Sequence, residues 1–295
     1  MYNHELYPFE SKWVEIENHK IHYVDEGQGQ VLLFSHAALG SSFMFRRFIQ
    51  ILSKNHRCIA LDYPGFGLSE GKAECEYTVA SQCRILGLFI GRLRLEDIIA
   101  LGHDTGGPSL FKVATDYPEL FRGLILTDTI IFPTMEYGRI HRMLNILGSR
   151  AVRFVNRYTN FLVRLTFNKG VVTRSLSAEE RKQYHDLFNT HQKRERIIQM
   201  LSSLRQQSDH MKIVKKGFET ELNGIPTLLI YGEKDPVTEL GIPDRIHAML
   251  KNSELFFIKK EGHFPHEGQP ERMSEIISQW VLINWSDKAE PMVVT

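Results

Sequence analysis

In the first half of the chain, a short apolar run, a glycine-flanked aspartate and a helix-like segment follow one another directly. Residues 98–101 are all apolar and predict a buried strand, and residues 109–114 have the spacing of a helix facing a core. Gly102 and Gly106 flank Asp104 at the spacing of a sharp strand-to-helix turn, which tolerates little side-chain bulk. Such a turn lifts the central side chain above the sheet, and the following helix N-terminus favours a negative group there. We therefore expect Asp104 to be a nucleophile, with a helix N-cap as its alternative role.

The rest of the chain repeats this alternation of buried strands and helices. Residues 13–17 and 21–25 predict an antiparallel hairpin. Further apolar runs predict buried strands at residues 31–34, 58–61, 124–126, 226–231 and 254–258, and helical spacing predicts helices at residues 42–52, 77–92 and 269–285. Strands that alternate with helices imply right-handed crossovers and a mostly parallel sheet, so we expect an α/β fold.

One long segment interrupts the alternation, because no buried strand is predicted between residues 133 and 218 and the apolar spacing there is helical. We therefore predict a core domain of residues 1–132 and 219–295 and an inserted helical cap of residues 133–218. Residues 139–216 carry seventeen Lys or Arg and five Asp or Glu, although the net charge of the whole chain is +1. Two interpretations stay open: a cationic lid that attracts anionic substrates or an acidic partner, and the solvated outer faces of ordinary helices.

The amino-acid composition indicates which cellular compartment and which kinds of partner to expect. The three cysteines, Cys58, Cys75 and Cys83, are too sparse for a disulfide framework and are typical of a reducing compartment. The polar N-terminus does not resemble a signal peptide and no apolar stretch could span a bilayer, so we expect a cytoplasmic protein without a membrane partner. Nothing in the charge predicts binding to nucleic acid, and no pattern predicts a metal site or a cofactor. The oligomeric state stays open.

Two downstream loops are expected to meet Asp104. Asp235 follows the penultimate predicted strand and His263 follows the last one. Because the loops after parallel strands share the carboxyl edge of a sheet, we expect the three side chains to converge there. An imidazole oriented by a carboxylate suits a general base near neutral pH. Asp128, which follows the strand before these two, is an alternative acid, and we favour Asp235.

The chain order of nucleophile, acid and histidine resembles the α/β-hydrolase superfamily, over about residues 7–285. Within it, Gly102-His103-Asp104 resembles the aspartate-nucleophile branch, which contains haloalkane dehalogenases and epoxide hydrolases, and residues 7–11 resemble the dehalogenase side. The resemblance implies the α/β-hydrolase fold, with a mostly parallel central sheet flanked by helices and an inserted helical cap. It also implies an enzyme that needs no cofactor.

The same resemblance implies a mechanism. Asp104 would attack an sp³ carbon of a small, mostly apolar substrate and form an alkyl-enzyme ester, which a water activated by His263 would hydrolyse. Backbone N–H groups of Thr105 and of Ala37 or Ala38 would bind the oxyanion. The residues expected to line the substrate pocket are His36, Tyr137 and Phe264.

The sequence also departs from the pattern of the branch. Haloalkane dehalogenases hold the halide with an Asn in the oxyanion loop and a Trp after the nucleophile, where this chain has Ala38 and Thr105. We therefore predict that the pocket for the leaving group is built from other residues than in haloalkane dehalogenases. Epoxide hydrolases use cap tyrosines to protonate the epoxide oxygen, and the candidates here are Tyr137, Tyr158 and Tyr184. The alternatives are a non-hydrolytic member, such as a β-lactone decarboxylase or a luciferase-like enzyme, and a non-enzymatic binding protein on the same fold.

Overall fold

The computed structural model describes residues 2–72, 76–168, 173–174 and 176–285. The strands are β1 (Lys12–Ile16), β2 (His19–Glu26), β3 (Val31–Ser35), β4 (Arg57–Leu61), β5 (Ile98–His103), β6 (Phe121–Thr127), β7 (Thr227–Gly232) and β8 (Ser253–Ile258). Within the described ranges they form one eight-stranded sheet in the order β1-β2-β4-β3-β5-β6-β7-β8. β2 pairs antiparallel with β1 and β4, and all other pairs are parallel. The predicted hairpin and mostly parallel sheet are confirmed.

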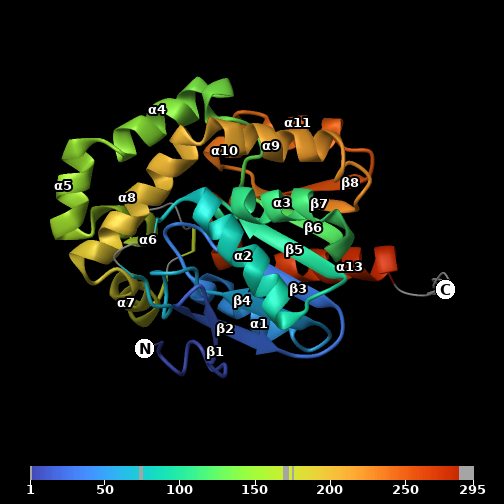
Figure 1. Cartoon of the computed structure of the whole chain (residues 1–295), viewed down its shortest axis with the longest axis horizontal. Helices are drawn as coiled ribbons and strands as arrows, with labels where there is room; N and C mark the ends of the chain where they lie inside the picture. The colour runs from blue at the N-terminus through green and yellow to red at the C-terminus, as the bar shows by residue number, and fades with distance from the viewer. Residues whose placement is uncertain (1, 73–75, 169–172, 175, 286–295) are drawn as a thin grey trace.

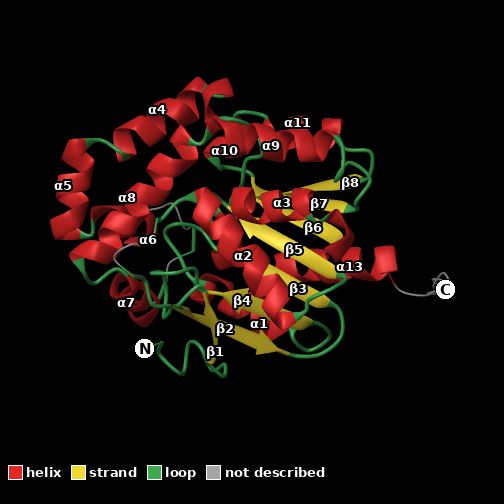
Figure 2. Ribbon diagram, in the orientation of Figure 1, coloured by secondary structure: helices red, strands yellow, loops and turns green. Residues whose placement is uncertain are grey.

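Helices cover both faces of this sheet (Figure 1; Figure 2). Those around it are α1 (Arg46–Leu52), α2 (Val79–Leu93), α3 (Gly106–Asp116), α9 (Ser208–Glu219), α10 (Pro236–Glu239), α11 (Ile242–Met249), α12 (Pro265–Gly268) and α13 (Pro270–Trp285). α2, α3 and α9 pack together on one face, and α1 and α13 pack together on the other. This division follows from right-handed crossovers that run in opposite directions from the middle of the sheet.

Because helices cover both faces of the sheet, the strands in its middle are buried. Every residue of β5 and of β7 is buried, as expected where helices lie on both faces of a parallel sheet. Each buried aliphatic side chain contributes about 1.5–3 kcal/mol relative to exposure, so the central strands anchor the loops that follow them. The helix predicted for residues 42–52 begins as a 3₁₀ turn, Ser42–Phe45, and continues as α1.

The predicted cap lies over the carboxyl ends of the parallel strands, where the arrowhead of β5 points (Figure 2). Its helices are α4 (Gly138–Leu147), α5 (Arg150–Thr159), α6 (Phe161–Asn168), α7 (Ala178–Leu187) and α8 (His191–Gln206). α4 and α5 pack against α8, and α6 packs against α7. α9 falls within the predicted cap of residues 133–218 but packs against α3. We propose that the cap ends with α8.

A buried ion cluster joins the cap to the core. Arg46 of α1 lies 2.5 Å from Glu267 of α12 and 2.6 Å from Glu180 of α7. Arg174 pairs with both glutamates, and the Tyr184 hydroxyl also donates to Glu267. Buried charges persist only when they are paired and hydrogen-bonded, so this Arg46 cluster (Arg46, Arg174, Glu180, Tyr184 and Glu267) fixes α7 against α1 and α12.

Cys58 is buried and Cys83 is half-buried, and both are free thiols. Cys75 lies outside the described residues. Over the described ranges, the structure contains no helix with both the length and the apolar character needed to cross a membrane.

Candidate active site

Asp104 lies at the sharp turn between β5 and α3. Its φ of +48° is in the left-handed region, a strained backbone conformation that clusters at functional sites. Close packing requires the flanking glycines, because a Cβ at Gly102 would lie 2.7 Å from the Cα of Gly107, and one at Gly106 would lie 2.4 Å from the Ser35 carbonyl oxygen. The turn therefore holds the carboxylate of Asp104 above the end of the sheet.

The neighbouring strand ends fix the backbone of Asp104. Its N–H donates to the Thr127 carbonyl oxygen at 3.3 Å, and the Thr129 hydroxyl donates to its carbonyl oxygen at 2.7 Å. The Tyr231 hydroxyl in turn donates to the Thr129 carbonyl oxygen at 2.9 Å. Three adjacent strands, β5, β6 and β7, thus pre-organise the position of the nucleophile.

Asp235 is fully buried just after β7, where it is the N-cap of α10. Its Oδ1 accepts a hydrogen bond from the Val237 N–H at 3.1 Å, which leaves Oδ2 for another partner. Gly232 allows the loop after β8 to pass close by, because a Cβ there would lie 2.0 Å from the Gly262 carbonyl oxygen. This close approach brings His263 beside Asp235.

His263 connects the two carboxylates. Its Nδ1 lies 3.0 Å from Asp235 Oδ2, and its Nε2 lies 3.6 Å from Asp104 Oδ1. The Nδ1–H therefore donates to Asp235 and Nε2 faces Asp104. Burial lowers the pKa of His263, but the charge of Asp235, the hydrogen bonds and the charge of Asp104 outweigh it and raise this pKa well above its usual value. Both Asp104 and His263 remain 23% exposed, so a small molecule can reach them.

Asp128, the alternative acid, lies beside this pair. It is almost completely buried, and its Oδ1 accepts the Gly232 N–H at 2.9 Å. Burial and the neighbouring charge of Asp235 raise the pKa of Asp128 well above its usual value. Burial also opposes ionisation of Asp235, but the charge of His263 and its hydrogen bond prevail and lower the pKa of Asp235. These shifts favour Asp235 as the ionised partner of the imidazole.

Asp128, Asp235 and His263 are also residue types that bind metals, and their ligand atoms lie within 4.8 Å of one another. Most of their atoms already have partners, however: one oxygen each of Asp128 and Asp235 accepts a backbone N–H, and His263 Nδ1 bonds Asp235, while the buried Asp128 Oδ2 has no hydrogen-bond partner among the described residues. A metal ion would displace the imidazole–carboxylate bond that orients the histidine. We therefore interpret the group as a proton-sharing set of side chains.

The loop after β3 carries the predicted oxyanion donors, and one of them is occupied. The Ala38 N–H donates to Thr105 Oγ1 at 2.7 Å, and the Thr105 side chain is completely buried. Ala38 therefore does not present a free N–H, contrary to expectation. The backbone N–H groups of Ala37 and Thr105 remain the candidates for binding an oxyanion.

An apolar cavity of about 780 Å³ lies between this group of residues and the cap. Asp104, His263 and the predicted Phe264 line it on the core side. The aliphatic side chains that line it from the cap include Ile140, Leu144, Leu147, Leu162 and Leu204. A cavity of this size and character suits a small, mostly apolar molecule.

His36 was expected at the pocket and lies elsewhere. It is fully buried and does not line the cavity. Its Nε2 accepts the Tyr63 N–H at 3.0 Å, and its Nδ1 donates to the Ala37 carbonyl oxygen at 2.8 Å. Burial lowers the pKa of His36, so the neutral ring braces the oxyanion loop with both nitrogens.

The three cap tyrosines also lie away from the cavity lining. Tyr137 accepts a hydrogen bond from Arg245 at 2.9 Å, and the hydroxyl of the buried Tyr184 is used by Glu267. Tyr158 is exposed, with its ring 5.0 Å from that of His191. Tyr137 therefore does not line the pocket as expected, and none of the three is placed to protonate an epoxide oxygen.

Two lysines are among the polar residues that line the cavity, and the sequence pattern did not indicate them. Lys234 and Lys260 line it from the loops that carry Asp235 and His263. Their only signal in the sequence was position, since Lys234 directly precedes Asp235. Which lysine faces a cavity depends on how each loop folds back, and spacing does not reveal that.

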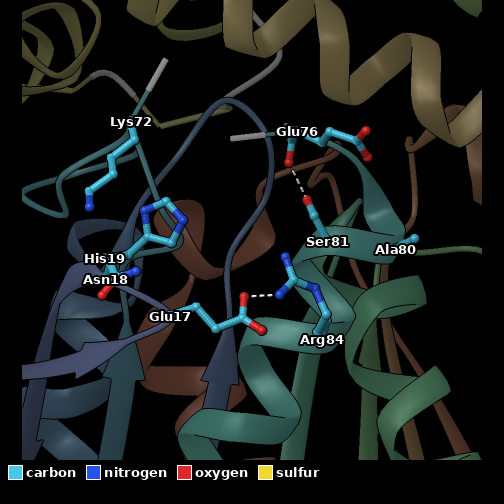
Figure 3. A pocket seen from close by; sticks show the side chains of 8 residues that line it. All are labelled: Glu17, Asn18, His19, Lys72, Glu76, Ala80, Ser81 and Arg84. Atoms are coloured by element: carbon cyan, nitrogen blue, oxygen red, sulfur yellow. Dashed lines mark hydrogen bonds and ion pairs between the residues drawn. The ribbon is translucent and has the colours of Figure 1, made fainter. Parts of the chain in front are cut away.

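A second pocket, of about 650 Å³, lies beside the turn between β1 and β2 (Figure 3). Several of its polar groups bond to one another: Arg84 pairs with Glu17, and the Ser81 hydroxyl donates to the Glu76 carbonyl oxygen. Among the described residues that line this pocket, no nucleophile is paired with a base. The apolar cavity above Asp104 is therefore the candidate active site.

Comparisons with known proteins agree with this geometry. A family model described as the alpha/beta hydrolase fold matches residues 30–270. Haloalkane dehalogenase 2 of Mycobacterium tuberculosis is 31% identical over 279 residues, which cover 92% of this chain and 95% of that protein. A cis-3-alkyl-4-alkyloxetan-2-one decarboxylase of Shewanella oneidensis is 24% identical over 273 residues, covering 88% and 80%. Among solved structures, the haloalkane dehalogenase DatA of Agrobacterium tumefaciens C58 has a TM-score of 0.82 at 20% identity, covering 94% of this chain and 97% of that one, a likeness of fold.

Proposed function

Since the chain belongs to the α/β-hydrolase fold family, as an enzyme of the haloalkane dehalogenase and epoxide hydrolase type, we propose that it hydrolyses small, mostly apolar molecules through an ester on Asp104. The observation that carries the proposal is the placement of His263 between Asp104 and Asp235, beside an apolar cavity. A carboxylate, a base and an acid in this order provide a nucleophile and a separate activator of water.

In the first step, an oxygen of Asp104 attacks the sp³ carbon that bears the leaving group. A C–O bond forms, and the leaving group departs with the electron pair of the bond that breaks. The apolar walls of the cavity exclude water from the carboxylate and hold the substrate near it.

In the second step, His263 Nε2 takes a proton from a water molecule, and the resulting hydroxide attacks the carboxyl carbon of Asp104. The tetrahedral oxyanion is bound by the N–H groups of Thr105 and Ala37. Its collapse expels the alkoxide, which takes the proton back from His263 and leaves as the alcohol. The Asp104 carboxyl group then releases the remaining proton to solvent, which restores the carboxylate and balances the charge of the leaving group.

The charge of Asp104 links these two steps. In the free enzyme, Asp104 contributes to the raised pKa of His263. Ester formation removes this negative charge, so the pKa of His263 falls, a protonated ring releases its proton to solvent more readily, and the neutral ring can then accept a proton from water. Asp235 stays ionised throughout and stabilises the imidazolium that forms.

A β-lactone is a second candidate substrate. The residues available to bind a leaving group favour it over a haloalkane. Ala38 has no side-chain donor and Thr105 is buried away from the cavity lining, so neither offers a side chain to a halide, whereas Lys234 and Lys260 would attract a carboxylate. Attack by Asp104 on the ring carbon that bears the lactone oxygen opens the ring and expels a tethered carboxylate. Loss of CO₂ with cleavage of the ester bond then gives an alkene and regenerates Asp104. One relative is named as a decarboxylase of such lactones.

The proposal is tested with the variant His263→Gln and a panel of short haloalkanes, an epoxide and a disubstituted β-lactone. Removing the base should block ester hydrolysis, so a haloalkane substrate should leave an alkyl group on the peptide that contains Asp104, visible by intact-mass and peptide analysis. The wild-type protein should release halide and alcohol, or CO₂ and alkene from the lactone. His247→Gln changes a surface histidine of α11 and should retain full turnover.

Asp104→Ala provides the decisive control. Turnover by this variant at the wild-type rate, or an adduct on any other residue, would reject the ester on Asp104. Alkene without alcohol would select the lactone reaction over hydrolysis.

A further inference from the structure

α5 is amphipathic, but it exposes its apolar side, whereas a helix that packs on a core buries its apolar side. Its one fully buried residue is the polar Asn156, which donates to the Arg194 carbonyl oxygen at 3.2 Å and accepts the Leu162 N–H at 2.9 Å. The large apolar residues that the helix exposes are Phe154, Val155 and Tyr158, at 66%, 42% and 54%. An exposed apolar stripe of this kind marks an interaction surface.

A basic stripe runs beside the apolar one. Arg150, Arg153 and Arg157 are spaced by three and four residues, so they share one side of the helix and border Phe154 and Tyr158. The sequence contains no Asp or Glu between residues 137 and 178. Arg153 pairs with Glu195 of α8, whereas Arg150 and Arg157 have no acidic partner among the described residues.

The neighbouring helices extend this surface toward the active site. α4 exposes Ile146 and α6 exposes Phe161. Met143 of α4 and Leu165 of α6 are also exposed, and both line the cavity above Asp104. In Figure 1, α5 lies at the edge of the molecule and α4 adjoins it on the outer side of the cap. Exposed apolar residues therefore lie on α5 and also on α4 and α6, two helices that line the cavity.

We propose that the outward side of α5, defined by Arg150, Phe154, Val155, Arg157 and Tyr158 and called here the α5 face, binds the surface of an anionic lipid membrane. Helices that lie in a membrane interface combine a large apolar face with Arg or Lys at its border. The apolar side chains enter the boundary between headgroups and acyl chains, and the guanidinium groups bind lipid phosphates.

The charge on this face favours lipid over a second copy of the chain. A symmetric dimer buries the same patch on both subunits, so it would bring two arginine stripes together in a partly desolvated interface. A membrane carrying phosphatidylglycerol or a similar lipid supplies negative charge and an apolar layer at once. The α5 face requires both.

The proposed docking differs from the expectation that the protein has no membrane partner. That expectation considered segments that span a bilayer, and an interfacial helix lies in the plane of the membrane without crossing it. Docking does not depend on the chemistry proposed for Asp104. It would, however, place the rim formed by Met143 and Leu165 near the layer where apolar substrates concentrate.

The test is co-sedimentation of the full chain with vesicles of phosphatidylcholine, alone or mixed with phosphatidylglycerol. We expect binding only to the mixed vesicles, weakening as salt is added. The double variants Phe154→Ser/Tyr158→Ser and Arg150→Gln/Arg157→Gln should each lower the partition coefficient about tenfold or more, because each arginine near such a surface contributes about 1 kcal/mol.

Matched controls separate the α5 face from general charge and hydrophobicity. Lys54→Gln/Lys251→Gln removes two exposed charges elsewhere, and Ile283→Ser removes an apolar side chain of α13 that is 74% exposed. Both should bind vesicles as the wild type does. Absence of binding to mixed vesicles, or an equal loss in the controls, overturns the proposal. Self-association in lipid-free solution that Phe154→Ser abolishes also overturns it, because the face would then belong to a second copy.

Discussion

α3 and α5 are both short helices with regularly spaced apolar residues. The apolar side of α3 faces the core, whereas the apolar side of α5 faces solvent. α3 buries Leu110, Phe111 and Ala114 between the sheet and its neighbours, and its N-terminus carries the turn of Asp104. α5 buries Asn156 and turns Phe154 and Tyr158 to solvent. The difference shows that the core uses its apolar surface for stability, whereas this part of the cap keeps apolar surface available to another molecule.

The same contrast holds for charge. In the core and at the boundary of the cap, charged side chains are buried and paired, as in the site around Asp235 and in the Arg46 cluster. On the outer side of the cap, arginines are exposed beside apolar residues. Substitutions should therefore have large effects on activity or stability in the first setting and small ones in the second.

The largest effect is expected at Asp235, the acid that bonds His263, and a much smaller one at the neighbouring Asp128. Asp235→Asn should lower kcat by about 10⁴-fold, because an amide does not stabilise the imidazolium and can hold the wrong tautomer of the ring. Asp128→Asn should cost less than about tenfold, because the neutral amide resembles a protonated carboxyl group. Steady-state kinetics of both variants check this, and a greater loss from Asp128→Asn would exchange the roles of the two acids.

The next effect concerns the Arg46 cluster. Glu267→Gln should lower the free energy of unfolding by about 3–5 kcal/mol, because it leaves part of a buried positive charge uncompensated. The matched surface change Glu271→Gln removes an exposed partner of Arg47 and should cost at most about 1 kcal/mol. Urea denaturation measures both. Equal losses would show that the cluster is not more important than a surface ion pair.

Acid should weaken the same cluster. Burial opposes ionisation of Glu180, but hydrogen bonds from Arg174 and Ser177 and the charge of Arg46 lower its pKa from 4.5 to about 2. A lowered pKa in the folded state contributes stability that is complete above about pH 4.5 and is lost as the pH falls toward 2. The free energy of unfolding should therefore decrease over this window. Glu180→Gln should reduce the slope, and an unchanged slope would contradict the assignment.

The smallest effect is expected on the outer side of the cap. Phe154→Ala should change the free energy of unfolding by no more than about 0.5 kcal/mol, since the side chain is mostly exposed. Phe111→Ala, the matched change in α3, should cost about 3–5 kcal/mol through cavity formation. Thermal or urea unfolding of the pair tests the contrast directly. A comparable loss from Phe154→Ala would mean that α5 packs its apolar side inward in solution.

Much of the architecture follows from local pattern. The strand at residues 98–101, the glycines around Asp104 and the loops that carry Asp235 and His263 all have short-range signals, namely apolar runs and turn residues. Parallel strands place their following loops at one edge, so convergence of these three residues could be expected from order alone. The roles of these residues stay proposals, to be decided by the trapping experiment.

That local pattern could not predict contacts between segments that are distant in the sequence. The hydrogen bond from the Ala38 N–H to Thr105, the position of Asp128 beside Asp235 and the use of both ring nitrogens of His36 each join residues whose spacing gives no hint of contact. The expected roles of His36 and Tyr137 at the pocket failed for this reason.

The sequence by itself determined which segments are strands and helices, because hydrophobic period and turn chemistry act over a few residues. It also determined the order in which the reactive side chains occur. Only the tertiary structure decided which side of α5 meets solvent, in which direction the pKa of each acid is shifted and which hydrogen-bond partner each N–H group finds. Those outcomes depend on burial, neighbouring charge and hydrogen-bond partners, and a chain acquires these only when remote segments pack together.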